Sequence, residues 1–196
     1  MAALLLLALA GSGLARSAEP LRDGDIVFQT SRSAQSEAIQ RATRSPYSHM
    51  GVIFFRGAKP FVLEAVATVR YTPLDRWVAR GGGKYVVRRL AQEPTAGQVG
   101  RLRRAAEKYA AKPYDLYFEW SDDRIYCSEL VWKAYHDALD IEIGARQTLR
   151  DFDLSDELVK AKMREHYGGR VPLDEPVISP AAMFDSPLLK TVERGN

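Results

Sequence analysis

Apolar residues in the first half of the chain gather in short runs that predict β-strands. One run spans 25–29 (DIVFQ) after the turn-like Asp23-Gly24, and two longer runs span 49–55 (HMGVIFF) and 61–69 (FVLEAVATV). Runs of this length and β-branched content are typical of strands buried on both faces. The two longer runs predict a hairpin that turns at 56–60, and 85–89 (YVVRR), after three glycines, predicts a further strand.

Helical spacing dominates elsewhere. The pattern predicts helices over 33–44, where Ser33 is a suitable N-cap, over 95–112, and over 155–167, where Gly168-Gly169 ends the last one. Between them, Cys127, Leu130, Val131 and Ala134 recur at the spacing of one buried helix face. We therefore expect an α+β fold in which a small, mostly antiparallel sheet is packed by helices.

Composition narrows the class of protein. The chain has 196 residues, 46% of them hydrophobic and 27% charged, which suits one globular domain with a sizeable core. The net charge is +3 and the pI is about 9.0, but the charges are dispersed along the chain. We expect no nucleic-acid partner, because such proteins concentrate their basic residues.

The N-terminus predicts export. Residues 1–18 contain a short apolar run followed by small residues, as in a secretory signal peptide, although no Lys or Arg precedes the run. The run is too short for a transmembrane helix, and no later stretch is long enough. We therefore expect a mature domain of 19–196 without a membrane span, in the periplasm or secreted.

The chain has a single cysteine, Cys127. In an oxidising compartment a single thiol has no internal partner, so Cys127 is either a buried apolar filler or a reactive group. Its place at the first turn of a helix favours reactivity, because helix N-termini stabilise thiolates. Ser121-Asp122-Asp123 resembles a helix-start cluster and is better explained by capping than by a metal site.

A cysteine nucleophile needs a base, and the chain offers three histidines. His136 lies nine positions after Cys127, on the opposite side of the same helix. His166 stands among charged residues and is expected to be a solvated surface histidine. His49 opens a strand, and Gly51, two residues on, leaves room on its face. His49 is therefore the predicted base.

Glu64 is the candidate that would orient the imidazole. It is isolated in an apolar run, and a carboxylate there is costly to bury without a partner. In the predicted hairpin, Glu64 shares a face with His49 if the numbers of facing residues have an odd sum, and lies on the other face if the sum is even. The turn permits either register, and the alternative role for Glu64 is a surface salt bridge to an arginine.

These motifs together resemble a known family. The segments DGDIVF (23–28), YSHMG (47–51), LEA (63–65) and YCSELV (126–131), in this order, are similar to the permuted papain-like amidases of the YiiX/YaeF type, relatives of the NlpC cell-wall peptidases. The resemblance extends from Asp23 to about Pro180. It implies a circularly permuted papain-like fold, with Cys127 as nucleophile, His49 as base and Glu64 as third member.

The chemistry that follows is an exported cysteine amidase or peptidase, a thiol protease in the broad sense, acting through a thioester. The expected substrate is a small peptide or cell-wall-derived amide, and no metal or cofactor is expected. Tyr126 and Gln29 are candidate donors to the oxyanion beside the Cys127 N–H. Two alternatives stay open: a thiol acyltransferase of the lecithin–retinol-acyltransferase-like group, which needs an apolar groove or a membrane-facing surface, and a peptide-binding module without turnover.

Overall fold

The computed structural model describes residues 19–195, so the expected signal peptide lies outside the described residues. The main sheet is antiparallel throughout, with the strand order β4-β3-β2-β1-β5-β8. Its strands are β1 (Ile26–Gln29), β2 (His49–Arg56), β3 (Lys59–Ala65), β4 (Val69–Pro73), β5 (Tyr85–Leu90) and β8 (Leu189–Gly195). A short second sheet pairs β6 (Gln147–Thr148) with β7 (Pro176–Val177).

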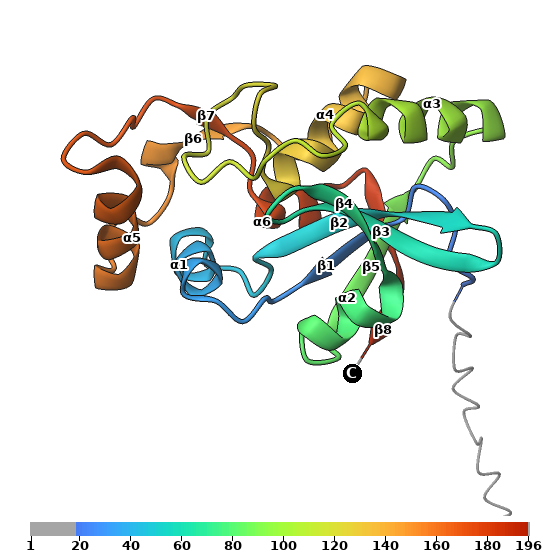
Figure 1. Cartoon of the computed structure of the whole chain (residues 1–196), viewed down its shortest axis with the longest axis horizontal. Helices are drawn as coiled ribbons and strands as arrows, with labels where there is room; N and C mark the ends of the chain where they lie inside the picture. The colour runs from blue at the N-terminus through green and yellow to red at the C-terminus, as the bar shows by residue number, and fades with distance from the viewer. Residues whose placement is uncertain (1–18, 196) are drawn as a thin grey trace, which may run out of the picture.

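Helices cover both faces of the main sheet (Figure 1). The longer helices α3 (Ala96–Glu107) and α4 (Cys127–Leu139) pack on one face, and the short α2 (Leu74–Arg80) packs on the other. Helix α1 (Ala34–Thr43) lies against α5 (Glu157–Tyr167) beside the sheet, and α6 (Pro180–Phe184) follows β7. A 3-10 helix spans Leu149–Asp151. This arrangement confirms the expected α+β class.

Alternation along the strands divides the core in two. Ile26, Phe28, Val52 and Phe54 face the larger cluster, which includes Leu130 of α4. Their neighbours Val27, Ile53 and Val62 face the smaller cluster around Trp77 of α2. Both faces of β1 and β2 are therefore buried, as the continuous apolar runs predict.

The predicted hairpin is present, but its second half differs. Val52 faces Leu63 and Arg56 faces Lys59, so the turn consists of Gly57 and Ala58, with Gly57 at a φ of +62°. The run 61–69 was expected to be one strand, yet β3 ends at Ala65 and the chain folds back into β4. The backbone N–H of Val66 donates to the carbonyl of Thr68 in this turn, which pairs Ala65 with Val69. A continuous apolar run cannot show such a turn.

Helix α3 ends at Glu107, although a helix to 112 was expected. Ala111 has a φ of +64°, and its N–H donates to the carbonyl of Val69. The carbonyl of Lys112 accepts from the N–H of Val69 in return. Pairing with the start of β4 thus replaces the last helical turn.

The expected cap of the cysteine helix is wrong. Helix α4 begins at Cys127 itself, with Tyr126 as an extended N-cap residue. Its cap is provided by Glu129, whose carboxylate accepts from the N–H of Tyr126 at 3.3 Å. Asp122 instead accepts from Lys133, which also donates to the carbonyl of Ser121. The acidic cluster therefore neutralises a lysine and caps no helix.

The sequence pattern predicts the start of helices α1 and α5 more accurately than the start of α4. Ser33 accepts from the N–H of Ser36 and caps α1 as expected. Helix α5 begins two residues later than expected, with Asp156 as its N-cap, and ends at Gly168. Helix α2, helix α6, β8 and the second sheet were not predicted. Elements this short depend on tertiary packing more than on local preference. Within residues 19–195, none of the helices is long and apolar enough to cross a bilayer.

Candidate active site

Cys127 is the first residue of α4, so its backbone N–H belongs to the unpaired first turn of the helix. The residue is 3% exposed and packs in the larger core cluster. The next residue, Ser128, donates to the carbonyl of Ile178 at 2.8 Å. The helix start that holds the thiol is thereby tied to the chain segment leading into α6.

His49 is brought to this helix start by β2. Its side chain hydrogen-bonds Cys127, while its Nε2 lies 2.6 Å from Oε2 of Glu64. In the β2–β3 hairpin Val52 faces Leu63, so the numbers of facing residues have an odd sum, and His49 and Glu64 lie on the same face of the sheet. Gly51 lies between them, and a Cβ there would meet Val62 Cγ1 at 2.5 Å and the Leu63 carbonyl at 2.7 Å. Glycine is therefore required at 51 for the strands to approach.

Glu64 is fully buried and accepts three hydrogen bonds. Besides His49, the hydroxyl of Thr72 on β4 donates to its Oε1 at 2.6 Å, and the guanidinium of Arg80 on α2 donates to its Oε2. Burial alone would raise the pKa of Glu64, but the bonds from His49, Arg80 and Thr72 outweigh burial and lower the pKa to about 2. The alternative prediction was a surface salt bridge between Glu64 and an arginine. An arginine, Arg80, does pair with Glu64, but the carboxylate is buried and not on the surface.

His49 holds its proton for a related reason. Burial alone would lower the pKa of His49, because it disfavours the charged imidazolium. Hydrogen bonds to Cys127 and Glu64, and the negative charge of both, outweigh burial and raise the pKa to about 9. Trp77, itself fully buried, stacks on the imidazole with ring centroids 5.9 Å apart. This cover strengthens the His49–Glu64 interaction because it keeps water away.

Tyr114 is a residue that the sequence analysis missed. Bridges Thr68–Pro113 and Tyr114–Ile125 place it beside the start of α4. Burial raises the pKa of its phenol well above the usual value, and the charge of Cys127 adds to this increase. The helix predicted to end at 112 indicates a break in the chain just before Tyr114, but nothing in the sequence indicates proximity to a thiol.

Tyr126 and Gln29, the predicted oxyanion donors, lie in different places. The hydroxyl of Tyr126 accepts from the N–H of Ile178 at 3.1 Å, and its ring packs edge-on against Phe118. Gln29 lies opposite His49 in the register of β1 and β2, with its amide buried against Gly81. Neither Nε2 nor Oε1 of Gln29 has a hydrogen-bond partner among the described residues. Both roles stay predictions.

The other two histidines lie outside the Cys127–His49 contact. His136 stacks on Trp132 with ring centroids 4.9 Å apart and is partly exposed, on the side of α4 away from Cys127, as predicted. His166 is partly exposed, as predicted for a surface histidine, but it also contacts the protein. Its Nδ1 lies 2.6 Å from the carbonyl of Leu116, and its ring stacks on Phe118. Contact between α5 and the 116–118 segment explains this placement.

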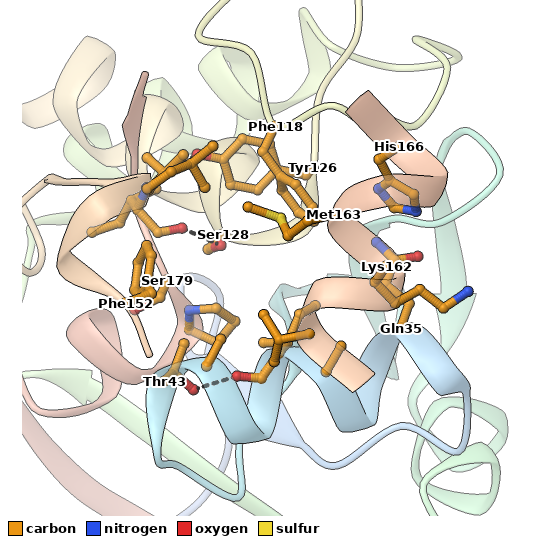
Figure 2. A pocket seen from close by; sticks show the side chains of 18 of the residues that line it. Gln35, Thr43, Phe118, Tyr126, Ser128, Phe152, Lys162, Met163, His166 and Ser179 are labelled. Atoms are coloured by element: carbon orange, nitrogen blue, oxygen red, sulfur yellow. Dashed lines mark hydrogen bonds between the residues drawn. The ribbon is translucent and has the colours of Figure 1, made fainter. Parts of the chain in front are cut away.

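Cys127 also lines an apolar hollow. Figure 2 shows side chains from three parts of the chain around it: Gln35 and Thr43 of α1, Met163 and His166 of α5, and Tyr126 and Ser128 at the start of α4. The remaining lining is mostly aliphatic and aromatic, as at Ile39, Phe152 and Val177. An apolar group next to the thiol would therefore be held without polar competition.

The fold and the side chains of Cys127, His49 and Glu64 together define a class, the permuted papain-like amidases. The sequence model of the family, described as permuted papain-like amidase enzymes of the YaeF/YiiX type, family C92, matches residues 20–193, so the chain belongs to this family. It is 51% identical to the uncharacterized protein YiiX of Escherichia coli K12 over 192 residues, which are 97% of this chain and 95% of that protein. A crystal structure described as metalloprotein yiiX from E. coli O157:H7 superposes with a TM-score of 0.86 at 53% identity, covering 88% of this chain and 97% of that chain.

The description as a metalloprotein applies to the E. coli crystal structure. Among residues 19–195 of this chain, no group of three or more His, Cys, Asp or Glu side chains could hold a metal ion. Oε2 of Glu64 is shared by His49 and Arg80, and an arginine is no metal ligand. The described residues therefore do not fit a metal centre.

Proposed function

We propose that this protein is a cysteine amidase in which Cys127 is the nucleophile, His49 the acid and base, and Glu64 the group that orients the imidazole. The observation that carries the proposal is the position of His49, which hydrogen-bonds Glu64 on one side and Cys127 on the other. A binding module has no need for this chain of groups, and buried titratable groups with strongly shifted pKa values beside a thiol are typical of functional sites.

The steps follow from these contacts. The thiol proton already rests on His49, and the Cys127 thiolate attacks the amide carbonyl carbon to form a tetrahedral intermediate. The C–N bond breaks as the imidazolium of His49 gives its proton to the leaving amine, which leaves a thioester on Cys127. Water, deprotonated by His49, then attacks the thioester and releases the carboxylic acid and the thiol.

The oxyanion needs donors on the far side of the carbonyl carbon. The free N–H of Cys127 at the start of α4 supplies one. We assign the second to the phenol of Tyr114, which lies close enough to Cys127 for the charge of the sulfur to raise its pKa. Tyr126 and Gln29 remain alternatives, and of these Tyr126 lines the hollow beside Cys127.

The substrate we propose is an amide with an apolar acyl part. The hollow next to Cys127 favours an acyl chain over the cell-wall peptides expected from the sequence, because peptidoglycan fragments are polar and charged. The same hollow is the apolar groove that a thiol acyltransferase needs, so the acyl group could pass to an acceptor other than water. Hydrolysis and transfer share the same thioester.

Export is the remaining part of the proposal. Residues 1–18 have the pattern of a signal peptide, so the site would act outside the cytoplasm. N-terminal sequencing of protein recovered from a periplasmic extract should find a chain that begins near residue 19. A chain that keeps Met1 and stays in the cytoplasmic fraction would contradict export and leave the chemistry untouched.

The test of function is a substrate panel. Wild type and Cys127→Ala are incubated with acyl amides of increasing chain length and with muropeptides, and the products are identified by mass spectrometry. We expect wild type to release the amine from acyl amides, with an acyl-thioester adduct on Cys127, and the variant to do neither. Cleavage of muropeptides alone would refute the acyl assignment, and no adduct with any member would refute the nucleophile.

The base is tested independently of the substrate. Iodoacetamide labels an activated thiol rapidly near neutral pH, and His49→Ala should slow labelling of Cys127 by tenfold or more. The matched control is His136→Ala, which removes a histidine on the same helix as Cys127 but outside the site. Equal rates in all three proteins would contradict the role of His49. Adding alcohol or amine acceptors then separates hydrolysis from transfer by the product formed.

A further inference from the structure

A second hollow adjoins the apolar one. The two share Gln35 and Ile39 of α1, but the second hollow is lined by His49 where the first is lined by Cys127. Its remaining lining includes Ser36, Ser48 and Tyr114. The proposed acid and the nucleophile therefore face different compartments of one cleft.

The chemistry decides which part of the substrate occupies each compartment. The group that protonates the departing amine must lie within hydrogen-bond reach of its nitrogen. His49 is that group, so the amine leaves on the His49 side, and the acyl part stays with Cys127 in the apolar hollow. The second hollow is thus the compartment for the leaving group.

The hydrogen bonds of two buried serines leave a donor free in this compartment. Ser36 and Ser48 share one hydrogen bond between their hydroxyls. The Ser48 oxygen also accepts from the N–H of Ser31 at 3.1 Å, and the Ser36 oxygen accepts from Gln40 Nε2 at 3.2 Å. Whichever serine donates to the other, one hydroxyl hydrogen remains without an acceptor among the described residues.

Gln35 adds a second unused donor at the border of the two hollows. Its buried Nε2 lies beside the phenol of Tyr114, which uses at most one of the two amide hydrogens, so at least one hydrogen has no acceptor among the described residues. Within the part of the chain that the structure describes, the residues lining this compartment include no Asp, Glu, Lys or Arg, and His49 is already paired with Glu64. Buried donors without a partner cost free energy, which a bound oxygen acceptor would recover.

We propose that this compartment selects an uncharged leaving amine that carries an oxygen acceptor, as amino alcohols do. The inference rests on the proposed amidase function and adds the chemical class of the amine. A propyl group has no acceptor for the free hydroxyl hydrogen of Ser36 or Ser48 or for Gln35. An ammonium or carboxylate group would enter without a counter-charge, and an unpaired charge is costly in a partly closed site.

Four amides of decanoic acid with leaving groups of similar size test this proposal: the ethanolamide, the propylamide, the glycine conjugate and the mono-amide of ethylenediamine. We expect kcat/KM for the ethanolamide to exceed that for the propylamide by about three- to tenfold, the value of one net hydrogen bond, and to exceed both charged amides. Equal values for ethanolamide and propylamide, or a preference for either charged amide, would overturn the proposal. Failure to cleave all four, with no adduct on Cys127, would overturn the proposed function itself.

Variants locate the donors. Gln35→Leu and Ser48→Ala should lower the ratio of ethanolamide to propylamide kcat/KM towards one, whereas Ser155→Ala, outside both hollows, should keep the wild-type ratio. An effect confined to folding would reduce both amides alike and leave the ratio unchanged, which contradicts the proposal. Gln35 is partly exposed and Ser48 is buried, so Gln35→Leu gives the answer if Ser48→Ala folds poorly.

Discussion

Replacing Glu64 by glutamine separates the charge of the third member from its shape. Glutamine is isosteric with glutamate, so its oxygen can still accept from His49 and Arg80, while its amide can donate to Thr72. What disappears is the negative charge beside the imidazole, one of the causes that raise the pKa of His49 to about 9. The Glu64→Gln variant should therefore keep its structure and release the proton of His49 at lower pH.

The size of the effect follows from the geometry. Nε2 of His49 and Oε2 of Glu64 are 2.6 Å apart in a buried pair, and an opposite charge this close moves a pKa by about 1 to 3. A fall of about 1.5 corresponds to about 2 kcal/mol. At pH 8.5 about three-quarters of wild-type His49 would be protonated but only about a tenth in the variant, whereas at pH 6 both would be almost fully protonated.

The assay is the pH profile of kcat/KM with a fluorogenic acyl amide, supported by NMR titration of the His49 ring. Protonation of the leaving amine needs the imidazolium of His49. The ratio of wild-type to variant kcat/KM should therefore be about eightfold larger at pH 8.5 than at pH 6. Glu107→Gln is the control, because Glu107 accepts from the hydroxyl of Tyr71 away from His49. A ratio of variant to wild type that stays constant from pH 6 to 8.5, with no change in the NMR titration, would refute the reasoning.

Three further predictions concern stability. Gly51→Ala should cost about 1–3 kcal/mol in urea unfolding, because its Cβ would meet Val62 Cγ1 at 2.5 Å, whereas Gly97→Ala, with no atom within 4 Å, should be neutral or stabilising; equal midpoints would contradict this. Arg80→Leu should cost about 1 kcal/mol and reduce kcat/KM less than Glu64→Gln does, because the guanidinium is partly exposed; an equal loss of activity would count against the dominance of Glu64. Folding lowers the pKa of Glu64 from 4.5 to about 2, so the ionised carboxylate stabilises the folded state above pH 4.5, and this stability is lost as the pH falls through 2. Between pH 4.5 and 2 the free energy of unfolding should therefore fall by about 3 kcal/mol less in Glu64→Gln than in wild type. Parallel curves of stability against pH would exclude this linkage.

The sequence by itself determined the local parts of the site. Helical spacing places Cys127 on a buried face and His136 on the other, because 3.6 residues complete a turn. Strand alternation reduces the position of Glu64 to two outcomes, since side chains alternate between the faces of a sheet. Order and spacing of four short motifs were sufficient for the family.

The tertiary structure decided everything that depends on contact between distant segments. The register of the β2–β3 hairpin selected the face of Glu64, and this register is set by a turn of Gly57 and Ala58 whose sequence permits either outcome. Arg80 and Thr72 reach Glu64 only because β4 folds back and α2 covers the sheet, and two isolated bridges place Tyr114 beside the helix start that holds Cys127. No periodicity records such contacts, because sequence spacing fixes direction along one element, whereas packing fixes the distance between elements.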